Sequence, residues 1–202
     1  SGISSLLHAI GAIPNFTDII FYFAKIYSIM KIIKTKKLHL GIVGGGPKSW
    51  IGHVHRIAAR YDNEYEIVAG VFSKNPKLSV KFGKSLGIDL NRCYSNYKEM
   101  AEKESKRDDC IDVIAIMTPP SSHQKIAEKF IDKNINIISD KPFAGDLRQA
   151  KRLYKKIKSN KKIKYALTHN YSAYPIVREA KMLIENGKLG NIEFINVEYV
   201  QD

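Results

Sequence analysis

The sequence has little cysteine, and this excludes small folds held together by disulfides or structural zinc. Only Cys93 and Cys110 occur in 202 residues, and neither stands in a C-x-x-C or Cys/His spacing. A chain of this length with 44% hydrophobic residues can bury a core without such links. We therefore expect a domain stabilised by packing, with no metal site and in a reducing, cytoplasmic setting.

The sequence also lacks a long uninterrupted apolar run. Residues 10–33 are apolar and aromatic, but Asp18, Lys25 and Lys31 interrupt them. The run of about 20 apolar residues that a membrane-spanning helix needs is therefore missing. No basic segment precedes this stretch, and no small-residue cleavage site follows it, which argues against a signal peptide.

The first 36 residues differ in character from the rest of the chain. Met30 is followed by a short lysine-rich segment and then by a strand pattern, which is a common start for a cytoplasmic protein. This predicts that residues 1–36 are an extension outside the fold. An amphipathic helix over residues 16–33 that binds a membrane or a partner is the alternative.

The sequence has fewer acidic than basic residues, and its formal net charge of +13 comes mostly from lysine. Such a charge suits a nucleotide phosphate, a nucleic acid or an acidic membrane, and does not choose among them. In the lysine-rich segment 151–164, however, Leu153, Tyr154 and Ile157 fall on one helical face and leave the lysines to solvent. We therefore expect no nucleic-acid or membrane partner; steeply salt-dependent DNA binding would revive the nucleic-acid interpretation.

From residue 38 onward, short β-branched runs alternate with helical patterns. This alternation is typical of repeated βαβ units, so the predicted fold class is α/β, a Rossmann doubly wound parallel sheet. The predicted cofactor domain spans residues 37–169, and residues 170–202 begin an incomplete α+β substrate domain. The expected strands cover residues 38–43, 66–72, 111–117, 135–139, 163–168 and 192–200; the expected helices cover 51–61, 76–86, 96–105, 121–133, 146–158 and 174–186. Capping patterns predict that Asn96, Ser121 and Asp146 cap three of these helices.

A glycine-rich loop follows the first predicted strand. A dinucleotide pyrophosphate needs a turn without side chains, so that backbone N–H groups and a helix N-terminus face its charge. Gly44 and Gly46 supply the first two glycines of G-x-G-x-x-G; Ser49 stands at the third place, and Gly52 comes three residues later. The placement between strand and helix predicts cofactor binding by this loop. Its predicted cofactor-binding residues are Gly44, Gly46, Pro47, Ser49, Trp50 and Ile51.

The second predicted strand ends without the acid that usually binds the ribose hydroxyls of NAD. Ser73 and Lys74 stand there instead. A hydroxyl and a cation suit the 2′-phosphate of NADP better than a free hydroxyl, so we expect NAD or NADP as cofactor, with a slight preference for NADP.

Two polar segments follow later strands, at the end of a parallel sheet where ligands bind. They read P-P-S-S-H over residues 119–123 and D-K-P over residues 140–142. Together with the glycine loop, the later H-N-Y-x-x-Y-P-x-V-R and the final G-K-L-G-N-I, in this order, they make the sequence from residue 38 to its end resemble the Gfo/Idh/MocA family. That family contains glucose-fructose oxidoreductase, inositol 2-dehydrogenase and many sugar dehydrogenases.

The resemblance implies roles for particular residues. Lys141 matches the lysine of the family's E-K-P motif and is the implied catalytic residue, while Asp140 stands where glutamate is usual. Taken alone, Lys141 would read as an ordinary loop lysine and His123 as a helix-start residue. The segment with Arg178 reads as helix surface. The further cofactor-binding residues implied are Thr118, Pro119, Pro120, His123, Asp140 and Lys141, and the implied substrate-binding residues are Lys141, Asn170, Tyr171 and Tyr174.

The sequence thus predicts an NAD(P)-dependent oxidoreductase that transfers a hydride between nicotinamide and a sugar, cyclitol or related polyol. The family's later D-x-x-x-H segment does not occur before Asp202, so we expect no steady-state turnover from these 202 residues alone. The complete protein is expected to be a homo-oligomer. A non-catalytic module that binds or senses a dinucleotide is the alternative, although such a module needs neither Lys141 nor the tyrosine segment.

Overall fold

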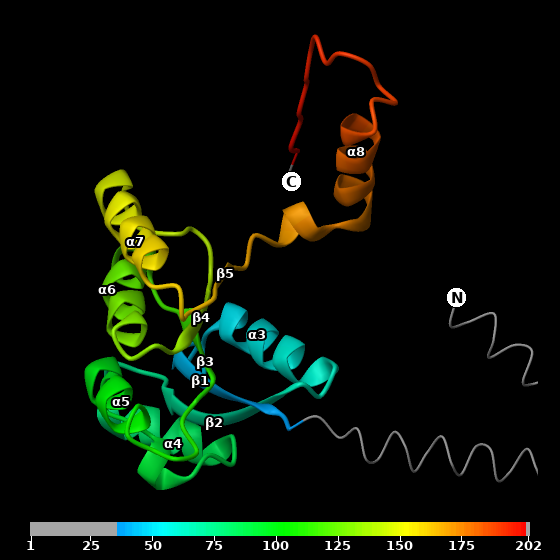
Figure 1. Cartoon of the computed structure of the whole chain (residues 1–202). Helices are drawn as coiled ribbons and strands as arrows, with labels where there is room; N and C mark the ends of the chain where they lie inside the picture. The colour runs from blue at the N-terminus through cyan, green and yellow to red at the C-terminus, as the bar shows by residue number, and fades with distance from the viewer. Residues whose placement is uncertain (1–35, 201–202) are drawn as a thin grey trace, which may run out of the picture. The chain divides into compact units, whose positions relative to one another are not determined.

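The computed structural model describes residues 36–200 of the chain. Contacts between Cα atoms divide the chain into two units, Ser1–Lys37 and Leu38–Asp202. Residues 1–35 of the predicted N-terminal extension, with the alternative helix over residues 16–33, lie outside the described residues. The second unit alternates strands and helices along the chain, as Figure 1 shows.

Five parallel strands form a single sheet in the order β2-β1-β3-β4-β5. The chain first adds β2 on one side of β1 and then continues with β3 on the other side, so the strand order reverses between β1 and β3. This arrangement confirms the predicted α/β class. The strands are β1 Leu38–Gly44, β2 Tyr65–Val71, β3 Val113–Met117, β4 Asn136–Ser139 and β5 Tyr165–Leu167.

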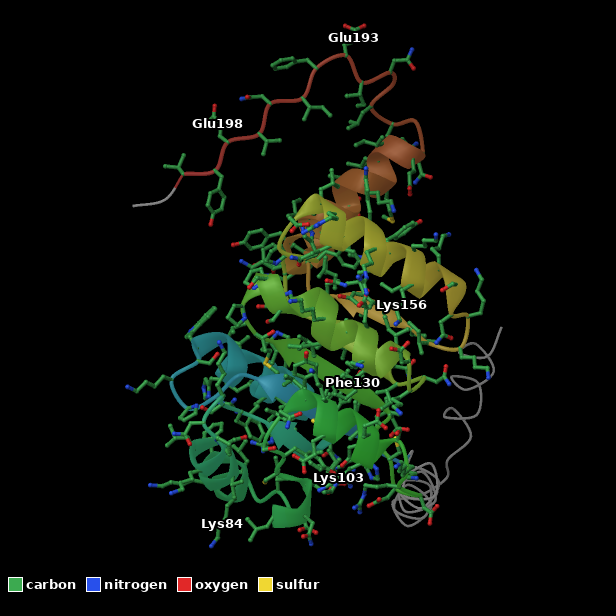
Figure 2. The ribbon with its side chains drawn as sticks, turned by 90° about the vertical axis from the view of Figure 1, so that its left-hand side faces the viewer. Lys84, Lys103, Phe130, Lys156, Glu193 and Glu198 are labelled. Carbon is green, nitrogen blue, oxygen red and sulfur yellow. The ribbon has the colours of Figure 1, made fainter. Side chains whose placement is uncertain are left out.

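Helices cover both faces of this sheet because successive residues of a buried strand point to opposite sides. In β1, Leu40 and Ile42 pack with apolar residues of α3 and α4, whereas Val43 belongs to the core formed with α5, α6 and α7. Phe130 of α6 is fully buried in that second core (Figure 2). The helices are α3 Trp50–Tyr61, α4 Pro76–Ser85, α5 Tyr97–Glu104, α6 Pro120–Ile131, α7 Leu147–Ser159 and α8 Pro175–Glu185, with short 3-10 helices at Leu90–Arg92 and Asn170–Ala173.

Side-chain caps start four of these helices. Ser49, Asn75, Asn96 and Asp146 each accept a hydrogen bond from a backbone N–H of the first helical turn. The predicted cap at Ser121 is wrong, because α6 already begins at Pro120 and has no side-chain cap. The ring of a proline fixes φ in the helical range, so it can open a helix without such a bond.

The predicted strand over residues 192–200 is also wrong. The chain forms no strand there within the described residues, and Phe194 and Val197 are exposed. Figure 2 shows Glu193 and Glu198 on this extended segment. An alternating pattern gives a strand only where a neighbour accepts its backbone hydrogen bonds, and no described segment pairs with this one. Helix α8 forms as predicted, but none of its residues is buried.

One buried ion pair links the 3-10 helix before α5 to α5 itself. The Glu104 side chain is fully buried and accepts hydrogen bonds from Arg92 Nε at 3.0 Å and from the Tyr94 hydroxyl at 2.7 Å. Its second carboxylate oxygen accepts from a terminal nitrogen of Arg92 at 2.5 Å. Burial and the hydrogen bond to Glu104 raise the pKa of Tyr94. The buried charges of Arg92 and Glu104 therefore depend on each other for their hydrogen-bond partners.

Replacing Glu104 tests this dependence. Glu104→Ala leaves the Arg92 guanidinium buried without its main acceptor, so the free energy of unfolding should fall by about 3–5 kcal/mol. Urea unfolding followed by circular dichroism measures the change. Glu102→Ala on the same helix removes an exposed carboxylate that pairs with Lys133, and it should cost much less. Equal losses in the two variants would contradict a supporting role for the buried pair.

Candidate functional site

The loop after β1 passes so close to other backbone that it has no room for side chains. Gly44 and Gly45 have positive φ angles of 93° and 62°, which favour glycine. A methyl group at Gly44 would collide with the carbonyl oxygen of Met117, and one at Gly46 would collide with the carbonyl oxygen of Phe72. The loop therefore presents bare backbone to the space beyond the sheet.

Helix α3 continues this close packing. Ser49 is the N-cap of α3, and its hydroxyl accepts a hydrogen bond from the Gly52 N–H at 3.1 Å. A Cβ at Gly52 would collide with the backbone of Gly45. Gly52, rather than the residue at Ser49, thus provides the close contact of helix and loop expected of a third glycine. The spacing from Gly46 to Gly52 is longer than in G-x-G-x-x-G, and the turn that Ser49 caps accommodates the extra residues.

A buried arginine fixes the orientation of the loop. The Arg56 guanidinium, on α3, donates a hydrogen bond to the carbonyl oxygen of Gly45 at 2.6 Å, and the residue is only 8% exposed. Because this carbonyl is directed toward the helix, the loop keeps it away from an anion bound on its other side. Arg56 also adds positive charge beneath the loop.

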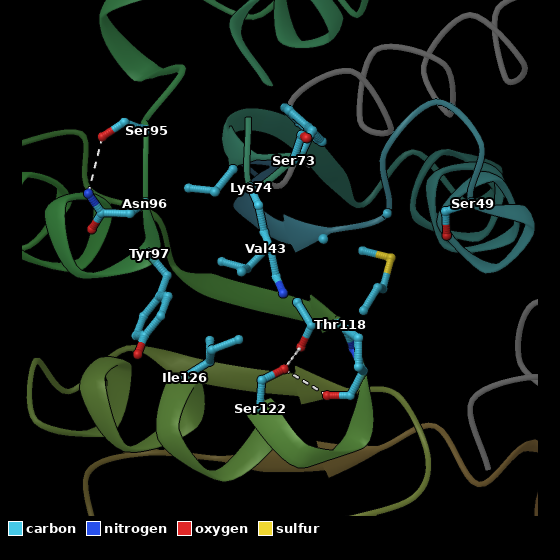
Figure 3. A pocket seen from close by; sticks show the side chains of 16 residues that line it. Val43, Ser49, Ser73, Lys74, Ser95, Asn96, Tyr97, Thr118, Ser122 and Ile126 are labelled. Atoms are coloured by element: carbon cyan, nitrogen blue, oxygen red, sulfur yellow. Dashed lines mark hydrogen bonds between the residues drawn. The ribbon is translucent and has the colours of Figure 1, made fainter. Parts of the chain in front are cut away.

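A first cavity of about 490 Å³ opens beside this loop at the carboxyl ends of β1, β2 and β3 (Figure 3). It lies where the strand order reverses, the place where open α/β sheets bind ligands. Lys74 extends into it and is the one charged side chain among the residues that line it. The lining residues are Val43, Gly44, Gly45, Ser49, Val71, Phe72, Ser73, Lys74, Ser95, Asn96, Tyr97, Met117, Thr118, Pro119, Ser122 and Ile126.

Hydrogen bonds hold the polar wall of this first cavity. The Ser122 hydroxyl lies 2.8 Å from the Thr118 hydroxyl and donates to the Pro119 carbonyl at 2.7 Å. On the opposite wall, the Asn96 amide donates to the Ser95 hydroxyl at 3.1 Å (Figure 3). Apart from Lys74, hydroxyl and amide groups therefore supply the polar side chains of a cavity that is otherwise apolar.

A second cavity, also of about 490 Å³, lies between α3 and the segments that follow β4 and β5. It brings together Asp140 and Lys141 from the first of these segments and Asn170 and Tyr171 from the second. Its lining residues are Trp50, Ile51, Val54, His55, Ala58, Asp140, Lys141, Thr168, His169, Asn170 and Tyr171.

Asp140 joins three elements at the floor of the second cavity. Its Oδ1 accepts a hydrogen bond from the Thr168 hydroxyl at 2.8 Å and lies 3.7 Å from Nε2 of His55. Burial lowers the pKa of His55, and the nearby Asp140 carboxylate only partly offsets this. His55 is therefore an uncharged imidazole at neutral pH, beside a carboxylate.

His123 connects the two cavities from beneath. The residue is fully buried, and its ring nitrogens lie 2.7 Å from the Thr118 carbonyl oxygen and 2.8 Å from the Pro142 carbonyl oxygen. Thr118 lines the first cavity, and Pro142 directly follows Lys141 of the second. The imidazole thus holds the two ligand-facing segments at a fixed separation.

The structure divides the predicted site residues among these places. Gly44, Ser49, Ser73, Lys74, Thr118 and Pro119 line the first cavity, while Trp50, Ile51, Asp140, Lys141, Asn170 and Tyr171 line the second. Five others line neither: Gly46 and Pro47 in the loop, Pro120 and His123 in α6, and Tyr174, whose ring lies 5.4 Å from that of Tyr171.

Sequence reasoning missed several lining residues. Asn96 was identified only as a helix cap, yet it and Tyr97 line the first cavity, and their position at the start of α5 was an available signal. His55 and Thr168 of the second cavity carried no motif of their own. Among residues 36–200, no group of three His, Cys, Asp or Glu side chains is arranged to hold a metal ion, and no helix is long and apolar enough to cross a membrane.

Comparison with known proteins agrees with this geometry. Residues 38–169 match the family profile of the Gfo/Idh/MocA oxidoreductases, described as an oxidoreductase family with an NAD-binding Rossmann fold. The uncharacterized oxidoreductase YfiI of Bacillus subtilis is 32% identical over 168 residues, which cover 83% of this chain and 42% of that protein. The chain therefore spans about two fifths of the length of this relative.

Solved structures give the same result. An oxidoreductase from Sinorhizobium meliloti is 45% identical with a TM-score of 0.73, and the match covers 77% of this chain and 43% of that one. An inositol dehydrogenase homolog from Azotobacter vinelandii, in complex with NADH and myo-inositol, is 30% identical with a TM-score of 0.72 and coverages of 77% and 41%. By its sequence, its parallel sheet and its glycine loop, this chain belongs to the Gfo/Idh/MocA family of oxidoreductases, of which it contains the NAD-binding Rossmann fold.

Proposed function

We propose that this chain is the cofactor-binding part of an NAD(P)-dependent dehydrogenase or reductase that acts on a sugar, cyclitol or related polyol. One observation supports this most directly. The bare-backbone loop at Gly44–Gly46 lies between a cavity that suits a nucleoside and a cavity that holds Lys141. A dinucleotide has the same order of parts, with its pyrophosphate between two nucleosides.

The residues present fit such a cofactor. The loop amides and the N-terminus of α3 would hold the pyrophosphate, because a Cβ there would fill the approach and the helix end favours negative charge. Tyr97 and Ile126 of the first cavity offer apolar surface for the adenosine half. The nicotinamide half, which accepts or donates a hydride when bound, would extend toward the second cavity.

Lys141 and the segment after β5 supply the groups that a polyol needs. Asn170 and Tyr171 can donate and accept hydrogen bonds to hydroxyl groups without adding charge. The exposed ammonium of Lys141 would stabilise the oxygen that changes between hydroxyl and carbonyl. Tyr174 would extend the same surface through its contact with Tyr171.

The organisation of the complete enzyme follows from this assignment. Residues 37–169 are the cofactor domain, and residues 170–202 begin the substrate domain. The exposed apolar face of α8 and the unpaired residues 192–200 fit elements that pack against a further sheet. We expect homo-oligomers through that sheet, a cytoplasmic location, and no steady-state turnover by these 202 residues alone.

A non-catalytic dinucleotide-binding module is the second candidate function. It would use the loop and the first cavity equally well. It would have no need for a second cavity in which a lysine, an aspartate, an asparagine and a tyrosine converge. This convergence favours the enzyme.

Lys74 supports a preference for NADP. With Ser73, it follows the end of β2, and none of the described residues that line the first cavity is acidic and would repel a 2′-phosphate. The Azotobacter relative was solved with NADH. The preference for NADP is therefore tested by measuring the affinity of this chain for both cofactors.

Lys74→Ala tests this preference. Removing the cation should weaken NADPH binding by roughly 10- to 150-fold and leave NADH binding unchanged, since a hydrogen bond to a charged group contributes about 1.5–3 kcal/mol. Isothermal titration calorimetry gives both dissociation constants. Lys77→Ala, an equal change of charge outside the cavity, is the control. Tighter binding of NADH than NADPH by the unaltered chain would refute the preference.

Arg56→Met tests whether the hydrogen bond from Arg56 to Gly45 orients the loop for cofactor binding. Losing the charged hydrogen bond to Gly45 frees the loop carbonyl, and affinity for both dinucleotides should fall by about 10-fold. Trp50 is the single tryptophan of the sequence, so energy transfer from it to bound NADH or NADPH reports binding. Arg60→Met removes the same charge one turn later on α3 and should have a smaller effect. If the two variants bind equally well, Arg56 does not position the loop.

Lys141→Ala separates the two candidate functions. In the complete enzyme it should lower kcat by about 100-fold or more while leaving the dissociation constant for the cofactor within about 3-fold. Stopped-flow absorbance at the NADH band measures the first quantity, and calorimetry the second. Lys151→Ala on the solvent side of α7 should change neither. Unaltered turnover would remove Lys141 from the proposed chemistry.

A further inference from the structure

A third cavity, of about 460 Å³, lies between α3 and the end of α4 and has no part in the function proposed above. A volume of this size is typical of a site for a small molecule. On α3, the lining residues are 53, 56, 57, 60 and 61, so successive turns present the same face of the helix to the cavity. On the other side, Phe82 and Leu86 stand one turn apart at the end of α4. Two helices therefore build this cavity.

Positive charge gathers in the third cavity without a matching carboxylate. Arg56 and Arg60 stand one turn apart on α3, His53 adds a ring nitrogen, and none of the described lining residues is acidic. Within residues 36–200, neither of these arginines forms an ion pair, whereas Arg92 and Arg152 do. Burial lowers the pKa of Arg56, and the like charge of Arg60 lowers it further. An anion held between the two guanidiniums would relieve this repulsion.

The rest of the lining is aromatic or apolar. Phe82 and Leu86 are half-buried, while Ile57 and Tyr61 are exposed. The guanidinium carbon of Arg56 lies 5.1 Å from the centre of the Phe82 ring, so the cation stands against an aromatic surface. Such a cavity suits a ligand whose charged group meets the arginines and whose apolar body covers the aromatic wall.

Arg56 belongs both to this third cavity and to the support of the cofactor loop. One of its terminal nitrogens donates to the Gly45 carbonyl at 2.6 Å, while its guanidinium lies over Phe82. A negative charge in the cavity would therefore meet the cation that stands beneath the loop. It would cancel part of the positive potential there and compete with the Gly45 carbonyl for the guanidinium.

We propose that the third cavity is a regulatory site for a small organic anion, a carboxylate or phosphate on an apolar body, which weakens cofactor binding through Arg56. The coupling rests on the proposed function, whereas the anion site does not. Arg56 and Arg60 would bind the charged group through N–H donors, a geometry that arginine offers to carboxylate and phosphate alike. Because coupling between two sites is reciprocal, a bound dinucleotide must weaken anion binding by the same factor.

Nuclear magnetic resonance of the ¹⁵N-labelled 202-residue chain, without cofactor, tests the anion site. Benzoate and phenyl phosphate, added at millimolar concentration and constant ionic strength, should shift the backbone amide signals of residues 56–61 and 82–86 until the site is saturated. Whichever of the two binds more tightly identifies the charged group. Benzamide, which has the same shape as benzoate without its charge, should leave these signals in place. Inorganic phosphate, which has no apolar body, should bind more weakly than phenyl phosphate.

Arg60→Met should weaken binding of the organic anion by about 10-fold, because it removes one of the two charged donors. Lys84→Met is the matched control: it removes the same charge from α4 outside the cavity (Figure 2) and should bind as the unaltered chain does. Calorimetry then measures the coupling. With the cavity saturated, the dissociation constant for NADH or NADPH should rise by about 5-fold, and it should rise less in Arg60→Met at the same anion concentration.

The outcomes separate the site from its coupling and from the proposed function. The anion site is overturned if neither anion shifts these signals, if benzamide shifts them as benzoate does, or if Arg60→Met binds as tightly as Lys84→Met. Shifts confined to residues 44–46 would place the anion at the cofactor loop and overturn the site too. An anion that binds in the third cavity and leaves cofactor affinity unchanged overturns the regulatory role. If neither dinucleotide binds, the proposed function and the coupling both fail, while the amide signals still decide the anion site.

Discussion

The structure depends on one steric constraint, the close contact between the loop after β1 and the start of α3. Gly52 lies against the backbone of Gly45, so the helix can begin directly beneath the loop. Arg56 then draws the Gly45 carbonyl toward the helix. With side chains absent and this carbonyl turned away, the helix N-terminus is open to a negatively charged group at the point where the strand order reverses.

Helix α3 serves both cavities because of this contact. Its cap, Ser49, lines the first cavity, while Trp50 and His55 line the second. Beneath them, His123 links the segments at Thr118 and Pro142 and so fixes the distance between the walls of the two cavities. A ligand that spans both cavities would therefore meet a preformed surface, which lowers the entropy cost of binding it.

Sequence patterns predicted correctly those elements that depend on interactions between residues close together in the chain. Apolar runs, capping residues such as Asn96 and Asp146, and glycine punctuation predicted the helices and buried strands closely. They failed where the outcome depends on a distant partner. Residues 192–200 alternate correctly for a strand, but a strand needs a neighbour for its backbone, and no described segment supplies one. At Ser121 the rigid ring of Pro120 prevailed over a side-chain cap.

The sequence by itself determined the fold class, the cofactor loop and the family, because these depend on periodicity and on motifs that are contiguous in the chain. It also identified Lys141 and the strand-end residues as a group. Only the tertiary structure brought His55 next to Asp140, 85 positions later in the sequence, and placed Arg56 under the loop. Those contacts join a helix face to distant strand ends, and the packing of α3 on the sheet, rather than any local pattern, decides which side chains meet there.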